Sequence, residues 1–117
     1  DSILLRSKRA NKVALKRLTT AQTLLKQNKE KPFYEEVSKA IWLYLSDKLS
    51  IPLSSLSRDS AQEALSKKNV PQPLQQKLER IVSECETALY APMGGTKQMN
   101  NTYQEAIKAI SELEETI

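Results

Sequence analysis

Apolar residues recur along the chain at the three- and four-residue spacing of α-helices. The first stretch with this spacing covers residues 8–27, which contain neither glycine nor proline. Asn28 follows it, and asparagine tolerates the left-handed conformation that commonly ends a helix. The pattern predicts a first helix over residues 8–27 whose buried face consists of Ala10, Ala14, Leu18, Ala21 and Leu25.

A second helix is predicted to begin near Pro32, because the fixed backbone of proline suits the first helical turn. Trp42 falls about 100° around the helix from Ile41, away from the centre of the apolar stripe. It therefore either covers the flank of the core or anchors a partner, and both interpretations stay open. The predicted buried stripe is Phe33, Val37, Ala40, Ile41, Tyr44 and Leu45.

A short third helix is predicted over residues 58–68, after a connector that contains Pro52. Its start is ambiguous, because Ser57 can act as the N-cap and Ser60-x-x-Glu63 also matches a capping box. The apolar residues on its inward side are Ala61, Ala64 and Leu65.

Two longer helices complete the pattern. The fourth begins around Pro71-Gln72-Pro73 and ends at Tyr90, with a stripe of Leu74, Leu78, Ile81, Val82, Cys85 and Leu89. The fifth covers residues 96–116, with a stripe of Met99, Tyr103, Ala106, Ile107, Ile110 and Leu113. A capping-box match at Thr102-x-x-Glu105 lies inside this stripe, so the earlier start is preferred.

No segment alternates polar and apolar residues as a strand would. The sequence thus predicts an all-α fold, a single compact bundle of about five helices with short connections. Short connections make successive helices antiparallel neighbours. One domain is expected over residues 1–117, with residues 1–9 as a basic lead-in and residues 10–117 as the bundle.

The composition excludes most catalytic chemistry. The chain has no histidine, one cysteine and two glycines, so histidine-based catalysis, thiolate metal clusters and glycine-rich phosphate loops cannot be built. Cys85 lies within an apolar stripe between Glu84 and Glu86, which predicts a core residue and not a nucleophile. We therefore expect no catalytic residues, no cofactor, no metal and no small-molecule substrate. An enzyme that uses only carboxylates and tyrosines is the remaining enzymatic alternative.

The positive charge is concentrated near the beginning of the chain. Residues 1–31 carry a net charge of +7, whereas residues 32–117 carry −3. Four of the cations, Arg6, Lys8, Arg9 and Lys12, follow Ile3-Leu4-Leu5 directly, as in the cytoplasmic flank of a transmembrane helix. A solvated helix face and a nucleic-acid-binding segment are the alternatives, although residues 1–31 contain no aromatic residue for base stacking.

The chain as given contains no spanning segment. Its longest apolar run, from Ala40 to Leu45, has six residues, whereas a span needs about 20. If a span exists, we expect it upstream of Asp1.

Several short motifs resemble one known family. They are Phe33-Tyr34, the apolar run that ends in Tyr44-Leu45, Lys48-Leu49-x-Ile51-Pro52, Leu56-Ser57, and Cys85-Glu86 followed by Tyr90-Ala91-Pro92. Together with the first and last helices they resemble the cytoplasmic C-terminal domain of the BatD aerotolerance, or oxygen tolerance, protein family. This resemblance covers nearly the whole chain.

The resemblance implies a small helical domain at the cytoplasmic face of the bacterial inner membrane, joined to the rest of the protein by a single upstream span. Proteins of this family are usually encoded beside a MoxR-type AAA+ ATPase and von Willebrand factor A proteins. The implied function is a non-enzymatic interaction module that docks such partners. Tyr34 and Trp42 are the predicted partner-binding residues, and Arg6, Lys8, Arg9 and Lys12 are the predicted membrane-proximal cations.

Overall fold

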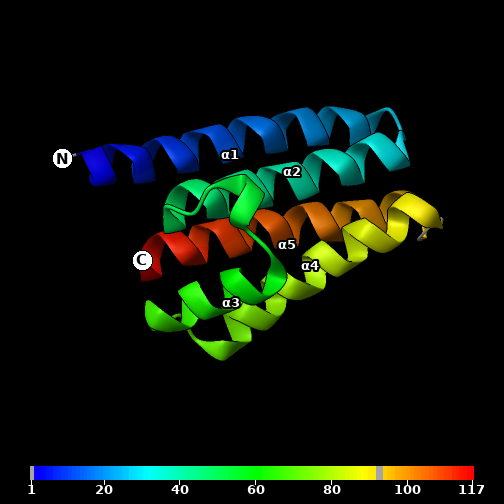
Figure 1. Ribbon diagram of the computed structural model, residues 1–117. Coiled ribbons are helices and arrows are strands. Elements are labelled where there is room, and N and C mark those ends of the chain that lie inside the picture. Colours follow the sequence, from blue (N-terminus) through cyan, green and yellow to red (C-terminus); the bar gives the residue numbers. More distant parts are fainter. Residues whose placement is uncertain (1, 92–93) are drawn as a thin grey trace.

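The computed structural model describes the backbone of residues 2–91 and 94–117, and within those ranges the side chains from residue 11 onward. This part of the chain contains five α-helices, one short 3-10 helix and no strand (Figure 1). The predicted all-α bundle of about five helices is thereby confirmed. The elements are α1 (Ser2–Lys26), α2 (Glu30–Leu49), η1 (Leu53–Ser55), α3 (Arg58–Lys67), α4 (Gln72–Tyr90) and α5 (Gly95–Thr116).

The helices pack as two antiparallel pairs with the shortest helix at one side. α1 lies along α2, and α5 lies along α4, as Figure 1 shows. α3 packs mainly against α2 and α4. The N-terminal end of α1 and the C-terminal end of α5 lie at the same end of the bundle, and α1 extends beyond its neighbours there.

α2 is the central helix, because it contacts all four other helices. Every residue of its predicted stripe is buried, and Tyr34 and Leu49 are buried as well. The stripes of the other helices meet it in one continuous core. In α4 and α5 the predicted stripes are buried except for Leu89 and Ile107, which are partly exposed. On α1, Ala14, Leu18 and Ala21 are buried and Leu25 is partly buried, whereas the side chain of Ala10 lies outside the described residues.

The first helix starts earlier than predicted, whereas the second starts near Pro32 as predicted. α1 begins at Ser2 and not at residue 8, because leucine, arginine, lysine and alanine all favour helix and nothing in residues 2–8 interrupts it. α2 begins at Glu30, so Pro32 is its third residue. Proline is tolerated there because the first four N–H groups of a helix have no partner within the helix.

The other helix ends follow from their capping residues. Asn28 has a positive φ of 57°, as its predicted place after the first helix requires. Ser57 is the N-cap of α3. Its Oγ accepts from the Ser60 N–H at 3.1 Å, and the Ser60 Oγ accepts from the Ser57 N–H at 2.8 Å. The alternative capping box at Ser60-x-x-Glu63 is therefore wrong. α5 begins at Gly95, where the earlier of its two predicted starts lies.

Replacing Ile41 by alanine should lower the free energy of unfolding by about 3 kcal/mol, since the side chain is fully buried in the central helix and its loss leaves a cavity. Urea denaturation followed by circular dichroism measures this change. The matched control is Leu53→Ala, because Leu53 is 50% exposed, and it should change stability by less than about 0.5 kcal/mol. Equal losses for the two variants would contradict the assigned core.

Candidate functional site

A groove of about 250 Å³ opens between α2, α3 and α4. Its apolar lining residues come from all three helices, and all of them except Trp42 are buried. Four glutamines also line it, and three of them are exposed whereas Gln75 is buried. An apolar centre inside a polar rim is the usual anatomy of a protein-binding surface. The apolar lining residues are Trp42, Leu45, Ala61, Leu65, Leu78 and Val82, and the amides are Gln62, Gln72, Gln75 and Gln76.

The groove exists because α3 is short and only lightly packed. Just two α3 residues, Ala61 and Leu65, are buried. The turn from α3 to α4 is closed by Gln75, whose amide Nε2 donates to the Val70 carbonyl oxygen at 2.9 Å. Arg58 Nη2 contacts Glu86 Oε2 at 2.5 Å and joins the start of α3 to α4. These few contacts hold α3 beside Trp42 without filling the space between the helices.

The groove has an excess of negative charge. Three charged residues line it, namely Arg58, Asp59 and Glu79. The charge of Arg58 is balanced by Glu86. Asp59 and Glu79 form no ion pair or hydrogen bond with any described residue, so two carboxylates face the groove without a cation.

Trp42 is one of the two predicted partner-binding residues, and it lines this groove. Its side chain is partly buried and packs against the core, so it covers the flank of the core as well. The indole N–H has no acceptor among the described residues.

Tyr34, the other predicted partner-binding residue, is fully buried, so its prediction as a surface contact is wrong. Its ring packs edge-on against Phe33 with 5.0 Å between the ring centroids. Eight residues of α-helix turn Tyr34 and Trp42 about 80° apart, and that rotation places Tyr34 among the helices that enclose α2. Burial raises the pKa of Tyr34, against an opposing effect of the nearby Thr102 hydroxyl.

The predicted basic residues all belong to α1. The side chain of Lys12 is exposed, whereas those of Arg6, Lys8 and Arg9 lie outside the described residues. Further along the helix, Arg17 Nη1 lies 3.3 Å from Glu36 Oε1 on α2. Arg17 is thus part of the α1–α2 contact, and the exposed positive charge of α1 is smaller than the sequence count implies.

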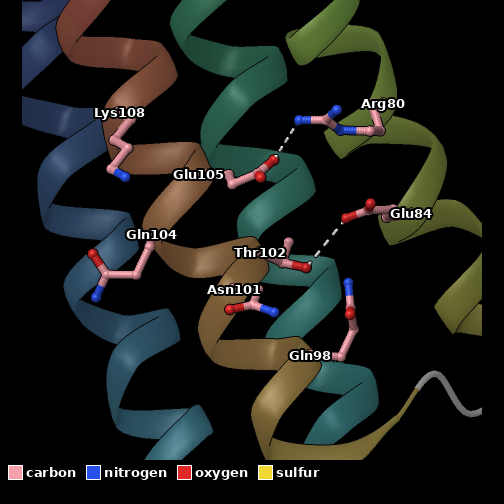
Figure 2. Close-up of a pocket in the computed structure, with 8 residues that line it drawn as sticks. All are labelled: Arg80, Glu84, Gln98, Asn101, Thr102, Gln104, Glu105 and Lys108. Atoms are coloured by element: carbon pink, nitrogen blue, oxygen red, sulfur yellow. Dashed lines mark hydrogen bonds and ion pairs between the residues drawn. The ribbon is translucent and has the colours of Figure 1, made fainter.

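A second hollow, of about 450 Å³, lies between α4 and α5 and is mainly polar (Figure 2). Arg80 and Glu84 reach into it from α4, and Arg80 Nη2 lies 2.8 Å from Glu105 Oε2 on α5. Thr102 Oγ1 donates to Glu84 Oε2 at 3.3 Å. Each of its two carboxylates thus has a partner on the neighbouring helix, an arrangement typical of contacts that join two helices.

Other titratable groups are arranged to hold helices together. Tyr44 donates its hydroxyl to Glu114 Oε1 at 2.8 Å, and Lys48 Nζ donates to Glu114 Oε2 at 3.0 Å. Burial, followed by this hydrogen bond, raises the pKa of Tyr44. Within the described residues, no three or more acidic or cysteine side chains converge to hold a metal ion. None of the described helices combines the length and apolar character that crossing a membrane requires.

Sequence reasoning predicted Trp42 as a partner-binding residue but did not predict the other residues that line the same groove. Asp59, Glu79 and the four glutamines look like ordinary exposed helix positions in the sequence. Only the position of α3 beside α2 and α4 brings them to one groove, and nothing in the local pattern encodes that position.

The fold and the groove define an all-α helical bundle with an amphipathic, acidic surface groove. No protein-family model, curated protein or solved structure matches this chain.

Cys85 should be inert in the folded protein. The thiol is fully buried, and burial, with smaller contributions from Glu84 and Glu86, raises its pKa to about 12. Only about one thiol in ten thousand is then ionised at pH 8, against about a quarter in an unfolded chain. A disulfide reagent followed by absorbance should react with the native protein at least about 100-fold more slowly than with the urea-unfolded protein. Equal rates would show that Cys85 is accessible.

Proposed function

We propose that this chain is the cytoplasmic helical domain of a BatD-like single-span membrane protein. In this proposal it is a non-enzymatic module that docks a MoxR-type AAA+ ATPase or a von Willebrand factor A protein in a bacterial aerotolerance or stress system. The observation that carries the docking role is the groove between α2, α3 and α4, where the partly exposed Trp42 lies among buried apolar residues and beside exposed polar side chains such as Gln62 and Gln76. The proposed family and class of partner rest on the resemblance of the short sequence motifs to the BatD family.

The geometry of α1 supports a position beside the membrane. α1 is one continuous helix from Ser2 to Lys26, and its N-terminal end extends beyond the bundle (Figure 1). A helix that leaves the bundle in this way can continue into a preceding span without a change of backbone conformation. Arg6, Lys8, Arg9 and Lys12 belong to its first half, and basic residues close to anionic headgroups contribute about 1 kcal/mol each.

The Trp42→Ala variant should bind its partner at least about tenfold more weakly, because a buried tryptophan at the centre of an interface contributes a large share of the binding free energy. Pull-down with a purified MoxR-type ATPase and with a purified von Willebrand factor A protein measures this. Tyr90→Ala is the matched control, since Tyr90 is 91% exposed and lies outside the groove. Circular dichroism checks that both variants are folded. If both variants retain the partner equally, Trp42 does not contribute to docking and the groove is not the docking site.

Replacing Arg6, Lys8, Arg9 and Lys12 by glutamine should reduce co-sedimentation with vesicles that contain anionic phosphatidylglycerol by at least about tenfold. Binding of the unmodified chain should weaken as salt is raised, because screening acts on exposed charges. The control replaces Lys39, Lys68, Lys97 and Lys108, four exposed lysines without ion pairs among the described residues, and changes the net charge equally. If the two variants lose binding alike, the membrane contact is not made by the first half of α1.

A further inference from the structure

The size of the Trp42 groove indicates what kind of occupant it takes. At about 250 Å³ it lies below the range of about 300–1,000 Å³ that is usual for small-molecule sites. Its apolar lining residues come from the three helices that border it, and Trp42 is the one among them that is partly exposed. A cavity of this size and form fits a few apolar side chains of a larger partner better than it fits a free metabolite.

The charges around the groove restrict the occupant further. Asp59 on α3 and Glu79 on α4 come from two of its bordering helices, and neither has a cationic partner among the described residues. Arg58, the one cation among the described residues that line the groove, is already paired with Glu86. Charge complementarity at an interface favours a partner of opposite sign and suppresses the approach of a like-charged one. An occupant that carries lysine or arginine beside its apolar residues can form ion pairs with both carboxylates.

The described residues offer no strand edge to which an extended peptide could add. The border of the groove consists instead of three helices, with the exposed amides of Gln62 and Gln76 on its rim. A helix laid in such a groove inserts apolar side chains from positions spaced three and four residues apart. The Trp42 indole N–H, which has no acceptor among the described residues, supplies a further donor to the occupant.

We propose that the Trp42 groove binds an amphipathic helix whose apolar stripe is flanked by lysine or arginine. This inference rests on the proposed docking function and specifies the chemistry of the segment that the partner presents. Apolar side chains of that helix fill the space between Trp42, Leu65 and Leu78. Its cations lie beside Asp59 and Glu79.

The test uses a synthetic helical peptide of leucine and lysine, with leucine at every third and fourth position, and a counterpart with glutamate in place of lysine. Trp42 is the only tryptophan of the chain, so its fluorescence reports directly on the groove. The lysine peptide should shift the emission of Trp42 to shorter wavelength with a saturable dependence on concentration. The glutamate peptide should bind at least about tenfold more weakly. Equal affinity for both peptides, or binding that leaves the emission unchanged, overturns the proposal.

A pair of matched charge variants separates the groove from general electrostatic attraction. Asp59→Asn with Glu79→Gln should weaken binding of the lysine peptide about 3- to 10-fold, as expected for two partly exposed charge pairs. Glu35→Gln with Glu115→Gln changes the net charge equally at exposed carboxylates outside the groove, and affinity should change less than about twofold. An equal loss in both variants would overturn the proposal, because the peptide would then respond to net charge alone.

The same two variants distinguish this inference from the proposed function. If the ATPase or the von Willebrand factor A protein binds at Trp42 but is indifferent to Asp59→Asn with Glu79→Gln, the docking function stands and the basic helix is wrong. If the lysine peptide binds in the groove and neither named protein binds at all, the chemistry of the groove stands and the proposed partners are wrong.

Discussion

Burial of α2 on most of its circumference is the constraint on which the rest of the structure depends. Helices usually bury one stripe, whereas α2 buries residues that point toward α1, α4 and α5 as well as toward α3. The other helices need only one apolar face each, because each covers a different part of α2. Polar contacts such as Tyr44 with Glu114 and Arg17 with Glu36 then fix how the outer helices lie against it. These contacts align the helices, and the apolar burial supplies most of the stability.

The groove follows from the one place where this enclosure is incomplete. α3 spans only ten residues and buries two of them, so it cannot cover α2 as α1 covers its own side. Trp42 lies where the cover is thin and is therefore partly exposed, although it belongs to the most buried helix of the chain. A large aromatic residue in that position shields the core, and in the proposed docking function it also offers an apolar surface to a partner. The two interpretations of Trp42 that the sequence left open are thus compatible.

The sequence predicted the helices well because their apolar stripes are local signals. Phe33, Val37 and Ile41 repeat at helical spacing, and all three are buried as that spacing requires. Tyr34 was misassigned because a residue beside the stripe is exposed on a helix with one covered face, but buried on a helix enclosed from several sides. How many neighbours a helix has is a property of the whole bundle. Asp59 and Glu79 were missed for the same reason, since they meet only through the packing of α3 on α4.

The membrane-facing and partner-facing surfaces of the proposal use different residues. α1 buries Ala14, Leu18 and Ala21 in the core and is joined to α2 by the Arg17–Glu36 ion pair, whereas α2 lines the groove with Trp42 and Leu45. A helix bound in the groove therefore leaves the burial of Ala14, Leu18 and Ala21 unchanged, because none of these three residues lines the groove. In the proposed arrangement a partner can dock while the domain stays beside the membrane. α2 is the structural link between the two surfaces, because it packs against α1 and also supplies the tryptophan of the groove.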